Sequence, residues 1–328
     1  MRYSPIPPSP QQPVRSPFFF APMLPFLARR LASLCGVLLC VLTLTFLLLR
    51  LSPGSPFARE RKLPPVIEQQ LLAKYHLEGS LWTQYTEYLG DVLHGDLRLS
   101  TKYRDRSVRE LLAQSLPVSA LLGSTAFLLA STLGIWLGST AAIRHHTPLD
   151  TSAMLLALAL ISVPTFVAGP LLVLIFSLSL GWLPVGGWNS PASLLLPAIT
   201  LAGPAIAAIA RLTRTSMLET LQAPFLRTAR AKGLSECRVL YVHALKTALL
   251  PVISYLGPLA AQLLTGSIVV ESIFNLPGTG SFFINAILNR DVFLLGGVVL
   301  VYCVLLVAMN LLVDLAYTWL DPRIRLDA

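Results

Sequence analysis

Long stretches without a charged residue constrain this chain more than any other feature of its sequence. Such apolar runs lie between Arg30 and Arg50, Glu110 and Arg144, Asp150 and Arg211, Lys246 and Glu271, and Asp291 and Asp314. A helix needs about 20 apolar residues to cross a bilayer, so four of these runs each fit one span. The run from Asp150 to Arg211 is long enough for two, and the turn-rich segment 181–191 divides it. The pattern predicts an all-α polytopic membrane protein with six transmembrane helices.

The placement of the charges predicts which ends of these helices face the cytoplasm. Only 12% of the residues are charged, against about a quarter in a typical soluble domain, and the net charge is +9. Basic residues gather before the first run, after the second, between Arg211 and Lys246, and after the last. Segments 181–195 and 273–291 are nearly neutral. Short loops rich in lysine and arginine stay in the cytoplasm, so we expect both termini inside, a lipid bilayer around the chain and no nucleic acid as partner.

Composition divides the chain into five parts. Residues 1–28 are rich in proline, which prevents a helix at that density, and are predicted to form a disordered cytoplasmic tail. The first transmembrane helix follows at 29–51, and the long loop 52–115 is placed in the periplasm, because loops of this length escape the charge rule. Residues 116–320 are predicted to form a core with the other five transmembrane helices and a cytoplasmic loop at 212–250, and residues 321–328 are predicted to form a cytoplasmic C-terminus.

The external loop 52–115 contains helical patterns of its own. Apolar residues recur at helical spacing in two places, first as Ile67, Leu71 and Tyr75 and then as Trp82, Tyr85, Leu89 and Val92. Segment 107–110, with Ser first and Glu last, has the sequence of a capping box that leads towards the second transmembrane helix. The patterns predict two or three short amphipathic helices, which either cap the bundle at the outer membrane surface or receive a periplasmic partner. Trp82 and Tyr85 are the candidate docking residues.

Sequence motifs for enzymatic chemistry are missing. The chain has no Gly-Lys dipeptide for a phosphate-binding Walker A loop, and no HExxH, GxSxG or kinase signature. The glycine-rich segment 276–280 lacks a following basic residue, and His145-His146 lack a carboxylate or cysteine cluster beside them. We therefore predict no catalytic residue, no metal site and no cofactor. Ionisable residues are nearly absent within the spans, which disfavours proton coupling, so energy for uphill transport would have to come from a partner.

A small basic helix is predicted in the cytoplasmic loop, where the sequence reads LRTARAKGLS from Leu226 to Ser235. Pro224 interrupts the helix that leaves the fourth span, Gly233 supplies a left-handed stop, and Ser235 can cap the next helix. The segment is thus held crosswise between two membrane helices. Its small residues would let the surface of another protein approach closely. The candidate coupling residues are Phe225, Arg227, Thr228, Ala229, Arg230, Ala231, Lys232, Gly233 and Leu234.

The same loop resembles a known family. Segment 228–233, which reads TARAKG, is followed by HALK at 243–246 and by Leu250-Pro251, and together they resemble the "EAA" coupling loop of ABC-importer permeases. Arg227 stands where that loop usually has a glutamate, and segment 233–251 is longer than the common form; both departures are typical of the peptide/nickel branch. Further segments look like the B-type permease subunits of bacterial oligopeptide importers, namely 50–57, 73–77, 276–280 and 321–325.

The resemblance implies a type I ABC-importer permease fold in the bacterial inner membrane. It implies a transport subunit rather than an enzyme, forming half of a translocation path for oligopeptides. The implied partners are a homologous second permease subunit, two ATP-binding subunits that hydrolyse ATP, and a periplasmic peptide-binding protein. One alternative is a permease for dipeptides, nickel or another small solute. Another, of a different class, is a membrane scaffold or sensor without a transport role.

Overall fold

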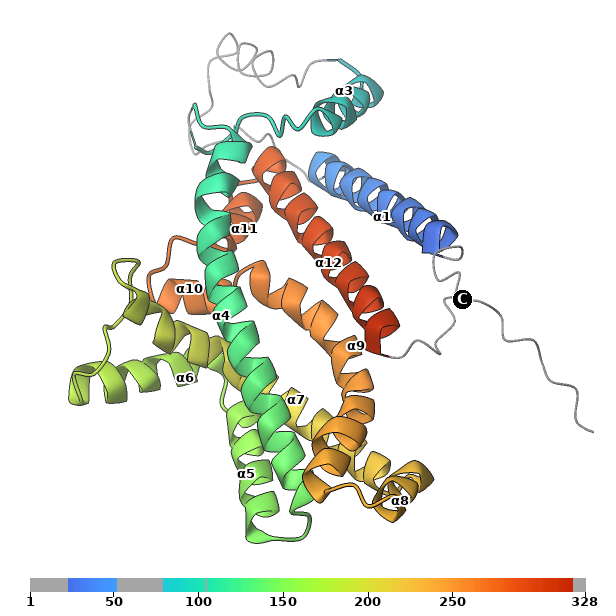
Figure 1. The fold of residues 1–328 in the computed structure, drawn as a ribbon. Coiled ribbons are helices and arrows are strands. Elements are labelled where there is room, and N and C mark those ends of the chain that lie inside the picture. The colour runs from blue at the N-terminus through green and yellow to red at the C-terminus, as the bar shows by residue number, and fades with distance from the viewer. Residues whose placement is uncertain (1–22, 52–78, 104, 321–328) are drawn as a thin grey trace, which may run out of the picture.

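The computed structural model describes residues 23–51, 79–103 and 105–320, and these form helices joined by short loops (Figure 1). An isolated antiparallel bridge joins Leu99 to Ser107. The helices are α1 (Met23–Leu51), α3 (Leu81–Leu93), α4 (Val108–Ile143), α5 (Pro148–Ser162), α6 (Thr165–Leu172), the π-helix η1 (Val173–Ser179), the short 3₁₀ helix η2 (Pro191–Leu194), α7 (Leu195–Leu221), α8 (Pro224–Ala231), the π-helix η3 (Arg238–Ala244), α9 (Leu245–Leu264), α10 (Ile268–Ile273), α11 (Thr279–Leu288) and α12 (Val292–Leu320).

Several of these helices are long and apolar enough to cross a membrane. Among the described residues, four candidates qualify by themselves, namely Val108–Ile143, Pro191–Leu221, Arg238–Ile273 and Val292–Val313. The pair α5 and α6–η1 qualifies only when both halves are taken together. The apolar stretch Ala32–Leu47 of α1 is shorter. The prediction of an all-helical protein with several apolar spans is therefore confirmed for this part of the chain.

The third predicted span differs from a straight helix. Pro148–Ser162 and Thr165–Ser179 meet at an angle of 104°. Val163, the residue before Pro164, has an extended backbone (φ −88°, ψ 115°). A proline ring disfavours the helical region for the residue before it, so α5 ends there and α6 starts in a new direction.

The first helix also begins earlier than the sequence indicates. α1 starts at Met23, within the segment predicted as a tail. Pro25 lies in its first turn, where a backbone N–H has no acceptor within the helix, so proline is tolerated there. The rest of the predicted tail, residues 1–22, the C-terminal residues 321–328 and the first amphipathic pattern of the external loop lie outside the described residues.

Helices α4 and α7 form the centre of the bundle. A Cβ atom at Gly134 of α4 would lie 2.7 Å from Ile209 of α7, and one at Gly138 would overlap the carbonyl oxygen of Ala210. The two glycines therefore allow the helix backbones to approach closely, as small residues do in membrane bundles. α9 packs beside this pair, and its Val252 is buried in an apolar cluster that also contains Ile209 of α7.

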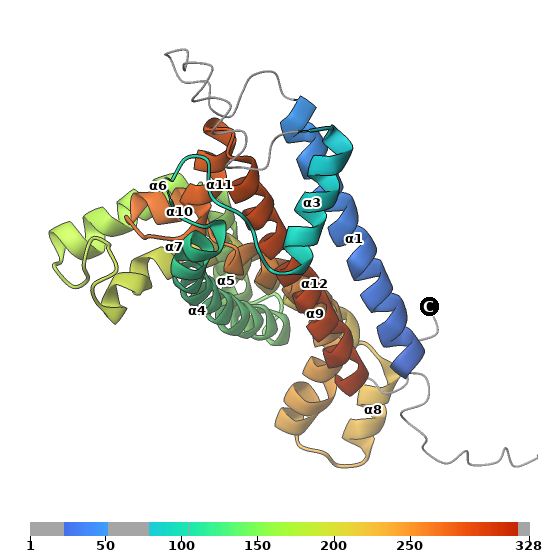
Figure 2. The same ribbon diagram turned by 90° about the horizontal axis from the view of Figure 1, so that it is seen from above.

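A cap built around α3 covers one end of the bundle (Figure 2). The buried Tyr88 of α3 stacks on Phe46 of α1, with ring centroids 5.9 Å apart. At the start of α4, the Ser107 hydroxyl accepts from the Glu110 N–H, and the Glu110 carboxylate accepts from the Ser107 N–H. The predicted capping box and the predicted helix at 82–92 are both confirmed.

Candidate functional site

The short helix α8 lies at the end of the bundle opposite α3 (Figure 1). α7 ends at Leu221, and α8 begins two residues beyond the cap, at Pro224. Proline suits the first helical position because its missing N–H would have no acceptor there and its φ is already helical. After α8 the chain turns into η3 and α9, so α8 connects two long apolar helices, as predicted.

One apolar side chain attaches α8 to the bundle. Within α8, all of which the structure describes, Leu226 is the buried residue. Its side chain is fully enclosed in a cluster contributed by α4, α7, η3 and α9, namely Ala142, Met217, Val239, Ala244 and Ala248. Burying a leucine side chain contributes about 1.5–3 kcal/mol, so this contact holds a helix that is too short to be stable alone.

The end of α8 is a glycine-terminated motif. Gly233 has φ +77°, its N–H donates to the Arg230 carbonyl at 2.9 Å, and the Leu234 N–H donates to the Ala229 carbonyl at 3.4 Å. This is the Schellman arrangement, in which a left-handed residue lets two N–H groups reach back to the last helical turn. A Cβ on Gly233 would meet nothing within 4 Å. The backbone conformation, and not crowding within this chain, therefore favours glycine here.

The outer face of α8 is basic and exposed. Exposed residues of α8 and its C-cap are Pro224, Phe225, Arg227, Thr228, Arg230, Ala231 and Lys232. Arg230 pairs with Glu236 at 2.7 Å, but both side chains face solvent, so the pair adds little stability. This face has an aromatic ring and several cations, which suits contact with another protein surface.

Ala229 is more buried than most of the other candidate coupling residues. It is partly buried against the Leu226 cluster, as is Leu234. Of the small residues in the motif, Ala231 and Gly233 are the exposed ones. A change at Ala229 therefore disturbs the attachment of α8 as well as its outer surface.

The two candidate docking residues of the external loop contact each other, with ring centroids 6.0 Å apart, but they differ in exposure. Trp82 is 72% exposed. Tyr85 contacts α1, where its hydroxyl lies 2.5 Å from the Thr43 hydroxyl and its ring centroid 5.4 Å from that of Phe46. Trp82 is thus available to a partner, whereas Tyr85 also holds α3 against α1.

A buried carboxylate explains the glycine-rich segment 276–280. Glu271 of α10 is only 1% exposed and accepts hydrogen bonds from the Ser119 hydroxyl at 2.7 Å and the Gly280 N–H at 2.9 Å. A Cβ atom at Gly278 would overlap the same carboxyl group. The segment therefore wraps around a carboxyl group that belongs to the chain itself. The sequence interpretation of 276–280 as a loop missed this, because Ser119 is far from it along the chain.

A second polar contact was also missed by sequence reasoning. Asp150, at the start of α5, accepts from Arg214 of α7, with Nε 2.6 Å from one carboxylate oxygen and Nη2 2.8 Å from the other. His145, interpreted from the sequence as part of a solvated loop, lies 2.9 Å from the same carboxylate. The participants are separated along the chain, and no spacing rule pairs them.

Comparison with known proteins gives consistent matches over most of the chain. The family "Binding-protein-dependent transport system inner membrane component" matches residues 133–326, which include α7, α8 and α9. The oligopeptide transport system permease protein OppB of Escherichia coli K12 is 47% identical over 92% of this chain and all of that protein. The dipeptide transport system permease protein DppB of Bacillus subtilis is 43% identical over 92% of this chain and 98% of that protein.

The fold has a counterpart among solved structures. A chain of the MetNI methionine ABC transporter in an inward-facing conformation superposes with a TM-score of 0.51 at 15% identity, covering 65% of this chain and 97% of that one. At this identity the likeness concerns the fold alone. The exposed helix between two spans is consistent with the sequence matches. The chain belongs to the binding-protein-dependent transport system inner membrane components, as a permease subunit of an ABC importer.

Proposed function

We propose that this chain forms half of the translocation path for oligopeptides in an ATP-driven importer of a bacterial inner membrane. A homologous permease subunit forms the other half, two ATP-binding subunits supply the hydrolysis, and a periplasmic peptide-binding protein delivers the substrate. Identity of 47% over the full length of a relative named for oligopeptide transport supports the substrate class. A permease for dipeptides is the second candidate, because a relative named for dipeptide transport is 43% identical.

In this proposal the chain crosses the membrane six times, through α1, α4, the bent pair α5–α6, α7, α9 and α12. Both termini and α8 face the cytoplasm, and α3 and α11 face the periplasm. Figure 1 supports this assignment, since α1 begins and α12 ends towards the side of the bundle where α8 lies. The positively charged loops support it as well.

The observation that carries the proposal is the construction of α8. A helix of eight residues is fixed by one enclosed leucine and exposes most of its other residues between two candidate spans. Such a helix gives an ATPase a surface to bind, with Phe225 as an apolar anchor and Arg227 and Lys232 as flanking cations. Movement of the ATPase then reaches α7 and α9 directly, because Leu226 is enclosed by side chains of both.

Purification of the chain with its partner subunits, followed by reconstitution into liposomes, tests the function. We expect co-purification of two ATP-binding subunits and ATP hydrolysis that rises when a loaded binding protein is added. Separate additions of oligopeptides, dipeptides and Ni²⁺ assign the substrate. A chain that purifies without an ATP-binding subunit, and whose preparation responds to none of these solutes, would support the scaffold or sensor alternative instead.

A further inference from the structure

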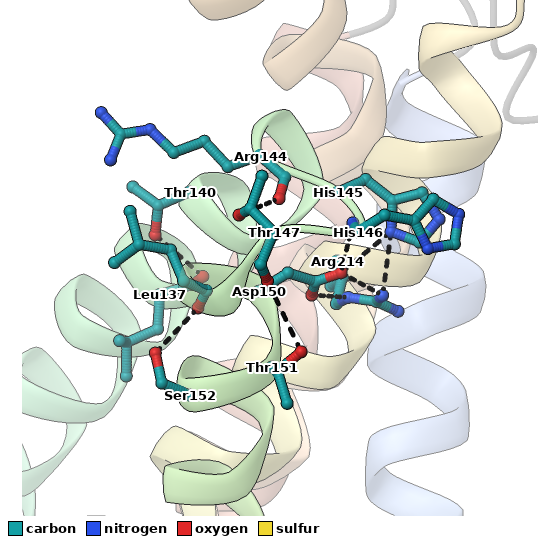
Figure 3. Close-up of polar contacts among 11 residues, drawn as sticks. Leu137, Thr140, Arg144, His145, His146, Thr147, Asp150, Thr151, Ser152 and Arg214 are labelled. Carbon is teal, nitrogen blue, oxygen red and sulfur yellow. Dashed lines mark hydrogen bonds and ion pairs between the residues drawn. The ribbon is translucent and has the colours of Figure 1, made fainter.

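A single ion pair links the third candidate span to the helix that leads into α8. Arg214 lies on α7 two turns before its end, and Asp150 lies in the first turn of α5. The guanidinium binds both carboxylate oxygens, at 2.6 and 2.8 Å (Figure 3). The Asp150 side chain is 7% exposed and that of Arg214 is 24% exposed. Two parallel N–H···O bonds fix distance and orientation more strictly than a single contact, so this pair restrains how α5 and α7 move relative to each other.

The turn between α4 and α5 belongs to the same arrangement. The His146 N–H donates to Oδ2 of Asp150 at 3.2 Å, and Nδ1 of His145 lies 2.9 Å from that oxygen. His146 has a left-handed backbone with φ +62°, which turns its N–H towards the carboxylate. Asp150 thus accepts hydrogen bonds from donors on α7 and in the α4–α5 turn (Figure 3). The dipole of its own helix also favours a negative charge in the first turn.

The ion pair is next to the attachment point of α8. Met217 lies three residues after Arg214, close to one turn along α7. Met217 is fully buried in the cluster that encloses Leu226. A displacement of α8 is therefore passed to α7 at Met217, one turn from the side chain that holds α5.

The far end of α5 lies beside an open apolar space, although its Leu160 packs against α7. A half-open apolar cavity of about 280 Å³ lies at the bend between α5 and α6, lined by Leu160, Val163, Ala168, Leu171, Gly203 and Pro204 among others. α7 therefore does not fill the space at the bend. The ion pair therefore fixes the start of α5 on α7, and the cavity leaves space beside the bend at its other end.

We propose that Asp150 and Arg214 are positioning residues that transmit the movement of α8 from α7 to α5 and, through the bend at Pro164, to α6. This inference rests on the proposed function of α8 as the contact for an ATPase. Loss of the pair leaves the ATPase bound and hydrolysing, but α5 and α6 no longer follow α7, so fewer solute molecules cross for each ATP hydrolysed.

The test uses the complete importer in liposomes and measures solute uptake and ATP hydrolysis separately. The variants are Arg214→Gln, Asp150→Asn and the double variant, and the matched control is Arg211→Gln. Arg211 is an exposed cation one turn earlier on the same helix, so its loss removes the same topological charge. We expect Arg214→Gln and Asp150→Asn to lower uptake per ATP roughly tenfold, within the usual range of coupling between sites, while co-purification of the ATPase stays unchanged.

Two further comparisons separate positioning from loss of folding. Arg214→Lys keeps the charge and should recover part of the uptake per ATP. The double variant should be no worse than either single variant, because residues that act as a pair give non-additive effects. The inference is wrong if Arg214→Gln and Arg211→Gln give the same uptake per ATP. It is also wrong if the loss of uptake per ATP in the double variant equals the product of the two single losses. A wild-type complex without solute-stimulated hydrolysis would instead overturn the proposed function.

Discussion

Gly278 packs against the carboxyl group of Glu271 so closely that a Cβ atom on the glycine would overlap it. Gly266, in the loop between α9 and α10, has φ +95° and also approaches this carboxyl group closely. Ser119 of α4 donates to this carboxylate and accepts from the Thr279 N–H at 2.8 Å. One buried group thus fastens α4, α10 and α11 together.

Gly278→Ala should destabilise the protein, because the added methyl group must displace a carboxylate that is hydrogen-bonded on both oxygens. Overpacking of this kind costs about 1–3 kcal/mol, and thermal unfolding of the purified chain in detergent measures it. The control is Gly90→Ala in α3, where a Cβ meets nothing within 4 Å. In a Glu271→Ala background the clash is gone, so the cost of Gly278→Ala should shrink; an equal cost in both backgrounds would contradict the packing described above.

Leu226→Ala should free α8 from the bundle while the spans stay folded. Removing an enclosed leucine costs about 2–5 kcal/mol, and α8 has no second buried side chain to retain it. Limited trypsin digestion reports the change through faster cleavage after Arg227, Arg230 and Lys232. Phe225→Ala is the matched control, since Phe225 is 45% exposed and should leave the digestion rate unchanged. Equal digestion of both variants would mean that Leu226 does not anchor the helix.

Gly233→Val should weaken the retention of the ATPase. A residue with a side chain at φ +77° is strained by about 1–2 kcal/mol, and relief of that strain unwinds the end of α8. Gly233→Asn separates conformation from size, because asparagine tolerates the left-handed region. We expect the asparagine variant to retain most of the ATPase in co-purification. If asparagine fails as fully as valine, the space that Gly233 leaves for the partner is what matters. Ala229→Asp should also release the ATPase, in part by disturbing the Leu226 cluster.

Trp82→Ala and Tyr85→Ala should have different effects, although both are candidate docking residues. Trp82 is exposed, so its loss should lower stimulation by the binding protein without changing thermal stability. Tyr85 contacts Thr43 and Phe46 of α1, so its loss should also lower the unfolding temperature. Stimulation assays and thermal unfolding on the same preparations distinguish the two. Normal stimulation of the Trp82→Ala variant would leave α3 as a structural cap alone.

Reporter fusions test the proposed topology. A periplasm-active reporter should be active at residue 80 or 285 and inactive at residue 230, because the basic loops are retained in the cytoplasm. A reporter that is active only in the cytoplasm should give the reverse pattern at the same sites. A cytoplasmic signal at residue 80 would contradict the arrangement.

The sequence predicted the features that depend on neighbouring residues. Uncharged runs located α4, α7 and α12, Ser107 and Glu110 located the start of α4, and Gly233 located the end of α8. Each of these rests on propensity, hydrophobicity or capping within a few residues. The sequence does not predict which side of α8 is enclosed, so it does not show that Ala229 packs against the Leu226 cluster.

Features that depend on distant segments were not predictable in this way. The pairs Asp150–Arg214 and Ser119–Glu271 form only when helices far apart in the chain pack together. The bend at Pro164 has an angle of 104°, which depends on the packing of α5 and α6 against α7 and α10. A single sequence gives the positions of these residues and not their partners.

The single enclosed leucine of α8 has a consequence for how importers of this kind diversify. Residues on the outer surface of α8 can be exchanged in evolution without disturbing the membrane helices, since those side chains contribute little to folding. If α8 binds the ATPase as proposed, compatibility with a given ATPase is a trait separate from the solute path. On that proposal, an importer of this kind can change its ATPase through substitutions in and directly after α8, with the membrane helices left unchanged.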